Sequence, residues 1–247
     1  MFARTPHSLR AALAHPSSTH RKARAPAARR AVTVMAGPPK PSKPLGHVVK
    51  GDRGSSKITL EAWLDFSCPF SGRFWRGCVS ALEEYDDSEV CFVAFNQIQP
   101  WHAQSALAHE TSLAVEALRG ADGFVAFSRA AFDESNWEKF TDVWCENKTK
   151  GEIYDAYVDL AKTACGLTDQ EAGEVRDALR LDADALARGE KNPGNKVTQN
   201  LKFYVKLARQ TGVHVSPSTY LNGLAVDTSS GWTREQWREF LDDALGK

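Results

Sequence analysis

The chain of 247 residues lacks any apolar run close to the ~20 residues that a membrane-spanning helix needs. It also has only five cysteines, and their spacing matches neither a disulfide framework nor a zinc site. We therefore expect no membrane span and no metal ion. Hydrophobic residues make up 42% and charged residues 25%, which excludes a disordered or collagen-like chain. This composition is typical of a soluble globular protein, here long enough for one domain with an insertion.

Acidic residues are absent from the first 51 positions, although ten basic residues occur there. The formal net charge of zero therefore combines a basic N-terminus with a remainder that holds 21 basic and 31 acidic residues. An acid-free segment rich in Arg, Ser and Ala is typical of an organelle transit peptide, and no apolar core of a secretory signal follows the first charges. Nucleic-acid binding is disfavoured, because the acidic remainder would repel phosphate.

The N-terminal region divides into two predicted parts. The segment 29–36 (RRAVTVMA) resembles the end of a chloroplast transit peptide. We expect residues 1–36 to be such a peptide, with a mitochondrial address or a plain basic tail as alternatives. Four prolines follow between positions 38 and 44, so residues 37–54 are predicted to form a linker or extended arm without regular structure. The folded domain would then cover residues 55–247.

The first part of the predicted domain shows an α/β pattern. Alternating apolar residues predict a strand over 57–65, and helical spacing predicts a helix from about 69 to 85. The run 89–95 is almost wholly apolar, which predicts a second strand buried on both faces. A strand–helix–strand unit of this length implies that the two strands pair in parallel.

A helical block and a second α/β part follow. Residues 102–211 show helical spacing almost throughout, and two short strands are predicted at 218–222 and 224–226. A last helix is predicted over 234–245. The order β-α-β, helical block, β-β-α predicts a thioredoxin-like fold. It would have a central mixed sheet and a large all-helical insertion between its two halves.

Two motifs carry a resemblance to a known family. The segment Asp65–Ser71 (DFSCPFS) resembles the active-site segment of DsbA-like thiol–disulfide oxidoreductases, in which Cys-Pro-aromatic-Cys opens a helix. The segment Gly212–Gly223 (GVHVSPSTYLNG) resembles the second signature of this family, a cis-proline before a short strand. The chain departs from the pattern twice. Ser71 stands at the position of the second cysteine, and Val215 stands where the family usually has glycine, so the motif is a monothiol variant.

The resemblance implies a site built around one reactive thiol. Cys68 would lie at a helix N-terminus, where unpaired N–H groups favour the thiolate, which is the nucleophile. Ser71 would donate a hydrogen bond to this sulfur. The substrate-binding residues that the resemblance implies are Pro69, Phe70, Ser216 and Pro217.

A single active cysteine implies exchange through a mixed disulfide, which a second thiol must resolve. Cys78 lies about 15 Å further along the same helix, beyond the ~7 Å that a disulfide allows between Cα atoms. The other cysteines are expected to be buried packing residues. The partners would be protein or peptide thiols and disulfides. Glutathione is a candidate co-substrate, and no tightly bound cofactor is expected.

Two other functions remain open at this point. The chain could be a redox-inactive thioredoxin-fold binding protein that uses the same cleft. It could also be a glutathione-dependent transferase or isomerase, in which Cys68 or Ser71 activates the glutathione sulfur. Among the neighbouring polar residues, Asp65 is expected to be solvated at the strand end, with a proton-accepting carboxylate under the active site as the alternative. His102 and His109 are expected to be satisfied or surface histidines.

Overall fold

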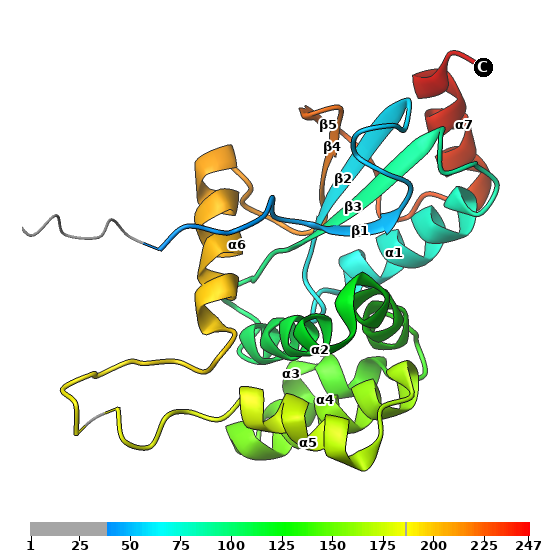
Figure 1. The fold of residues 1–247 in the computed structure, drawn as a ribbon. Helices are drawn as coiled ribbons and strands as arrows, with labels where there is room; N and C mark the ends of the chain where they lie inside the picture. Colours follow the sequence, from blue (N-terminus) through cyan, green and yellow to red (C-terminus); the bar gives the residue numbers. More distant parts are fainter. Residues whose placement is uncertain (1–38, 186) are drawn as a thin grey trace, which may run out of the picture. The chain divides into compact units, whose positions relative to one another are not determined.

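The structure is a computed structural model that describes residues 39–185 and 187–247 (Figure 1). One compact unit runs from Lys40 to Lys247. The chloroplast transit peptide expected at 1–36, and its mitochondrial alternative, lie outside the described residues and stay a prediction. In the described part of the chain, no helix is long and apolar enough to cross a membrane.

A mixed five-stranded sheet forms the centre of this unit (Figure 1). Its order is β1-β3-β2-β4-β5, with β2 and β3 parallel and all other neighbours antiparallel. The predicted parallel β-α-β unit and the C-terminal hairpin are thereby confirmed. The strands are β1 His47–Lys50, β2 Ile58–Leu64, β3 Val90–Asn96, β4 Ser218–Leu221 and β5 Leu224–Val226.

Two helices belong to the thioredoxin-like core, and the others form the insertion. The core helices α1 (Pro69–Leu82) and α7 (Arg234–Leu245) pack against each other. In Figure 1 the helices α2 to α5 lie together at one end of the sheet, and α6 stands beside it. The insertion comprises α2 Ser105–Ala131, the 3-10 helix Trp137–Phe140, α3 Asp142–Cys145, α4 Lys150–Cys165, α5 Asp169–Ala178 and α6 Thr198–Thr211.

The ends of the helices follow their sequence signals. Thr168 and Thr233 each open a helix through a capping box, in which the threonine and the residue three positions later satisfy each other's backbone N–H groups. Gly166 and Gly212 end α4 and α6 in the left-handed conformation that glycine adopts without strain. Gly120, with φ 68°, divides α2 into the two helical stretches that its apolar spacing indicates.

The predicted linker was wrong in one part, because residues 37–54 contain β1. This strand pairs antiparallel with the edge of β3. Its first residue, His47, is buried and stacks on Phe124 with ring centroids 3.6 Å apart, while Tyr204 covers its other side at 5.2 Å. A four-residue strand whose most buried residue is a histidine leaves no alternating apolar pattern to detect.

The insertion is also less helical than predicted. The described residues between α5 and α6 form turns and irregular backbone rather than a helix. This stretch contains several charged residues and glycines, and it lies mostly on the surface.

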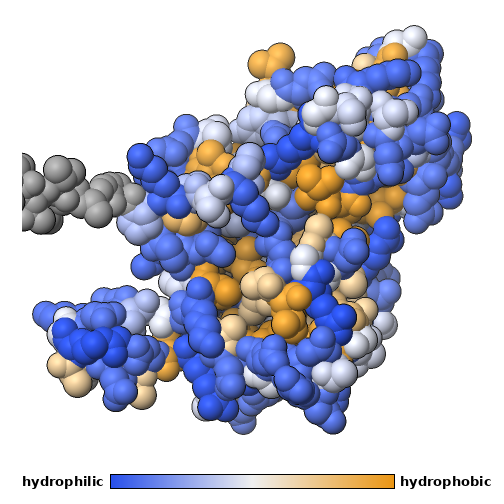
Figure 2. All heavy atoms as spheres, in the orientation of Figure 1, coloured by the Kyte–Doolittle hydropathy of each residue, from blue (hydrophilic) through white to orange (hydrophobic). Residues whose placement is uncertain are grey.

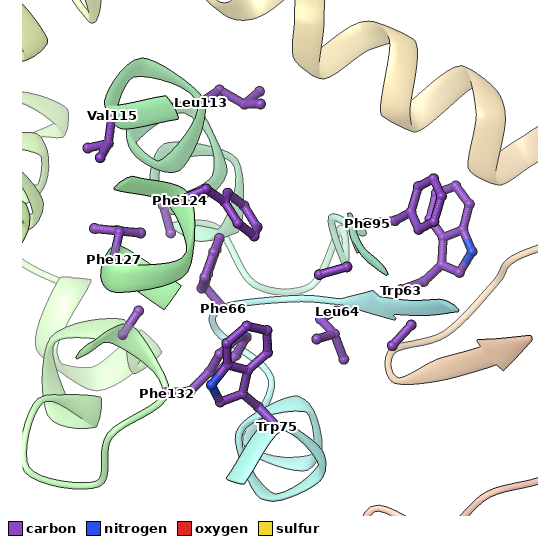
Figure 3. Close-up of a cluster of buried hydrophobic side chains, with 14 of the residues drawn as sticks. Trp63, Leu64, Phe66, Trp75, Phe95, Leu113, Val115, Phe124, Phe127 and Phe132 are labelled. Carbon is purple, nitrogen blue, oxygen red and sulfur yellow. The ribbon is translucent and has the colours of Figure 1, made fainter. Parts of the chain in front are cut away.

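An aromatic cluster joins the insertion to the sheet (Figure 3). Phe66, directly after β2, points into a group of phenylalanines from the insertion. Its ring centroid lies 5.0 Å from that of Phe132 and 5.5 Å from that of Phe127. Within the sheet, Trp63 of β2 stacks on Phe95 of β3 with ring centroids 4.4 Å apart. Phe66, which belongs to the cysteine motif, is thus held by apolar contacts with the insertion.

The docking of β1 gives a direct test of the corrected boundary. We expect His47→Ala to lower the free energy of unfolding by about 2 kcal/mol, because it removes a buried ring that stacks on two aromatic side chains. The exposed His214 is the matched control, and His214→Ala should leave stability unchanged. Urea denaturation at pH 7.5 measures both, and equal stability of the two variants would show that β1 does not dock.

Candidate active site

Cys68 lies between the end of β2 and the first turn of α1. It is the N-cap residue of α1, and Pro69 occupies the first helical position, where a missing N–H is harmless. The Cys68 N–H donates to the Asp65 carbonyl at 3.0 Å, and the Cys68 carbonyl accepts from the Gly72 N–H at 3.2 Å. No side chain caps this helix. The backbone N–H groups of its first turn therefore face the region of the sulfur without a competing side-chain acceptor.

The second motif lies directly against this cysteine. The Cys68 Sγ is 3.3 Å from the carbonyl oxygen of Ser216, and the Ser216–Pro217 peptide bond is cis, as the resemblance implies. The two segments meet because β4 pairs antiparallel with β2, with Ser218 opposite Trp63 near the end of β2. The chain just before β4 therefore passes the residues just after β2.

Ser71 lies close to Cys68 in the chain but serves a different neighbour. It is fully buried, and its Oγ accepts a hydrogen bond from the Asp65 N–H at 3.2 Å. Within the described residues no hydrogen bond joins it to the Cys68 sulfur. Its role as a donor to the thiolate stays a prediction.

Exposed apolar side chains occur in both motifs and in the loop after β3, whereas the cysteine itself is only 5% exposed. Phe70, two residues later, is 50% exposed, and Val215, beside Ser216, is 55% exposed. Trp101, in the loop after β3, is 61% exposed. Apolar surface of this kind suits contact with another molecule.

A buried carboxylate lies beneath this site, and the prediction for Asp65 was wrong. Asp65 is 0% exposed rather than solvated. Its Oδ1 accepts hydrogen bonds from the Ser67 N–H at 2.9 Å and from the Ser105 hydroxyl at 2.7 Å. Its Oδ2 accepts from the Gln99 N–H at 3.2 Å and lies 2.8 Å from Nδ1 of His102. The carboxylate is therefore bonded from the turn after β2, from the loop after β3 and from the first residue of α2.

The two histidines of this loop and helix face the same carboxylate. His102 is largely buried, and His109 is fully buried with its Nε2 3.6 Å from Asp65 Oδ1, which is long for a hydrogen bond but close for charge attraction. Burial alone would raise the pKa of Asp65, but the hydrogen bond to His102 and the attraction of His109 outweigh it, so this pKa lies well below its ordinary range. The hydrogen bond to Asp65 raises the pKa of His102.

Sequence reasoning missed Ser105 and Gln99, although one signal was available. The apolar run of β3 is followed by a run of polar residues, and several of these are buried. Buried polar residues are the informative exception in a folded chain, because each one needs a hydrogen-bond partner. The partner here is 34 or more positions distant in the sequence, so the run alone could not identify it.

The other four cysteines are packing residues. All five cysteines are free, and Cys78, Cys91 and Cys145 are buried, while Cys165 is partly buried. Burial raises the pKa of each of these four thiols, which disfavours the reactive thiolate. Cys68 is the cysteine that both motifs and the helix terminus single out.

Comparison with known proteins supports the fold. No family model matches the sequence, and no curated protein matches it. A solved structure described as a putative protein-disulfide isomerase from Pseudomonas syringae is 25% identical, with a TM-score of 0.58, over 78% of this chain and 96% of that one. BdbD from Bacillus subtilis is 16% identical with a TM-score of 0.55, over 82% and 94%. DsbA from Mycobacterium tuberculosis is 18% identical with a TM-score of 0.51, over 82% and 93%. The chain therefore has the DsbA-like thioredoxin fold.

The hydrogen bonds that surround the buried Asp65 carboxylate predict how the stability of the fold depends on pH. Because the pKa of Asp65 is depressed in the folded state, its ionised form stabilises the fold above the unfolded pKa of about 3.9, and this contribution is lost as the pH falls through the folded value. We expect Asp65→Asn to lower the free energy of unfolding at pH 7 by about 3 kcal/mol or more. The difference from wild type should narrow below pH 4. Asp87→Asn, at an exposed aspartate, is the control. If the two variants gave the same denaturation curves, the hydrogen bonds around Asp65 would not stabilise the fold.

The raised pKa of His102 predicts the opposite pH dependence of folding stability. Its raised pKa means that its contribution to stability is fully present below the unfolded pKa of about 6.5 and is lost as the pH rises through the folded value. We expect the stability difference between wild type and His102→Gln to be largest near pH 6 and to shrink towards pH 9. Urea denaturation at several pH values measures this, with the exposed His214→Gln as control. A difference that stays constant from pH 6 to 9 would argue against the ion pair.

Proposed function

We propose that this chain is a thiol–disulfide oxidoreductase that works through the single thiol of Cys68. One observation carries the proposal: the Cys68 Sγ lies at the start of α1 and 3.3 Å from the Ser216 carbonyl, beside cis-Pro217. Two of the similar solved structures are named as a putative protein-disulfide isomerase and as DsbA. These names support thiol–disulfide chemistry as the general class of reaction.

The site has what the first step of exchange requires. The N-terminal amides of α1 stabilise negative charge on the sulfur when the thiolate forms. The thiolate attacks one sulfur of a substrate disulfide, the substrate S–S bond breaks, and the other substrate sulfur leaves as a thiolate that takes a proton from water. The product is a mixed disulfide between Cys68 and the substrate. The exposed side chains of Phe70 and Val215 lie where a protein or peptide substrate would make contact.

The mixed disulfide needs a thiol from outside the chain. Ser71 has no sulfur, and the other four cysteines are packing residues with raised pKa values. Glutathione is the co-substrate that we propose for this step. A protein disulfide or a glutathionylated protein would be the first substrate.

One observation favours a second candidate, a redox-inactive binding protein. Cys68 is only 5% exposed, and its thiol donates to the Ser216 carbonyl. A substrate must displace this contact before the sulfur can react. In the second candidate, the same exposed apolar side chains would bind a partner without any exchange.

A pair of cysteine variants separates the two candidates. We expect wild-type protein to catalyse reduction of a glutathionylated peptide by glutathione, and Cys68→Ser to fall to the uncatalysed rate, because the nucleophile is lost. Cys165→Ser, at the least buried of the other cysteines, is the matched control and should keep full activity. Release of the peptide thiol is followed by chromatography. Equal rates for wild type and Cys68→Ser would refute the redox function and leave the binding protein.

A further inference from the structure

A small pocket lies beside the reactive cysteine. Its volume is about 330 Å³, and it lies against the first two turns of α1, starting at Pro69, the neighbour of Cys68. The opposite wall comes from the turn after α2 and the start of the 3-10 helix. The residues that line it are Pro69, Gly72, Arg73, Arg76, Glu134 and Trp137.

The two arginines of this pocket differ in their charge partners. Arg76 donates to the Glu134 carboxylate and to the Phe132 carbonyl, each at 2.7 Å, so its charge is already compensated. Arg73 forms no ion pair with any described residue, and its guanidinium lies 4.7 Å from the centre of the exposed Phe70 ring. The pocket therefore carries one uncompensated positive charge, on an otherwise acidic domain.

Trp137 lines the pocket from the start of the 3-10 helix. The indole N–H of Trp137 is buried and has no partner among the described residues. Gly72 adds no side chain to the α1 wall of the pocket.

We propose that this pocket binds the carboxylate end of a small anionic thiol of the glutathione class, the thiol that resolves the Cys68 mixed disulfide. The inference rests on the proposed function and adds a charge preference to it. A volume of 330 Å³ is at the small end of ligand pockets, which suits part of a short peptide. Arg73 lies five residues beyond Cys68, about 7.5 Å by helical rise.

The resolving steps balance without any further reactant. The anionic thiol loses its proton to water, and its thiolate attacks the Cys68 sulfur of the mixed disulfide. The substrate leaves as a thiolate and takes a proton, while Cys68 becomes bonded to the small thiol. A second molecule of the small thiol attacks the first one's sulfur, which releases the oxidised dimer and the Cys68 thiolate. Overall, two small thiols are oxidised and one substrate disulfide is reduced.

Three small thiols of similar size test the charge preference. Cys68 is converted to its mixed disulfide with 2-thiopyridine, in full-length protein with Cys165→Ser. Release of thiopyridone is then followed by absorbance with 3-mercaptopropionate (anionic), 2-mercaptoethanol (neutral) and cysteamine (cationic). Each rate is divided by the rate for the free cysteine mixed disulfide, which removes the intrinsic reactivity of each thiol.

Two variants should shift the preference in opposite directions. Arg73→Glu should lower the anionic-to-cationic rate ratio by about fivefold, as expected when a partly exposed ion pair becomes a repulsion. Glu134→Gln frees the charge of Arg76 and should raise the same ratio. Arg209→Glu on α6, at an exposed arginine without an ion pair among the described residues, is the matched control and should leave it unchanged.

The outcomes separate this inference from the function on which it rests. If the neutral thiol reacts normally but Arg73→Glu changes the ratio by less than twofold, or by no more than Arg209→Glu does, the pocket does not select anionic thiols. If none of the three thiols releases thiopyridone from the wild-type protein faster than from the free cysteine mixed disulfide, the proposed function and this inference both fail.

Discussion

The arrangement of the site depends on one buried charge, the carboxylate of Asp65. A charged group out of contact with water is strongly unfavourable unless hydrogen bonds and opposite charge surround it. The fold meets this requirement with partners from both of its parts: a backbone amide next to Cys68, and Ser105 and His102 from the start of the insertion. The charge thereby fixes where the helical insertion lies relative to the thiol. Phe66, the next residue, adds an apolar contact between the same two parts.

The register between β2 and β4 places the Ser216–Pro217 segment against Cys68. Residues Leu60 to Trp63 of β2 pair with β4 in reverse order, so the start of β4 meets the end of β2. The Ser216 carbonyl must then pass close to the residue that follows β2, although 148 positions separate it from Cys68. A shift of the register by two residues would move this carbonyl by about 7 Å and remove it from the sulfur.

The features that could be predicted from the sequence are those with a local physical cause. Alternating and all-apolar runs located β2 and β3, and the capping pattern at Thr233 located α7 within one residue. What the sequence did not reveal depends on distant contacts. The strand β1 exists because Phe124 and Tyr204 enclose His47, and Asp65 is buried because a loop about 35 residues later supplies its donors. Neither partner can be identified from the residue that needs it.

The serine in place of the second cysteine fits this network rather than interrupting it. The Ser71 hydroxyl accepts the N–H of Asp65, so the residue that removes the internal disulfide also holds the backbone of the buried aspartate. A thiol is a weaker acceptor than a hydroxyl, so a cysteine at this position would weaken that contact. In the proposed single-thiol reaction, the same replacement leaves Cys68 without a partner thiol in the chain, so the resolving thiol would come from solution. Under the same proposal, the serine at position 71 and the uncompensated cation at Arg73 are connected, because a resolving thiol from outside would need a place to bind near Cys68.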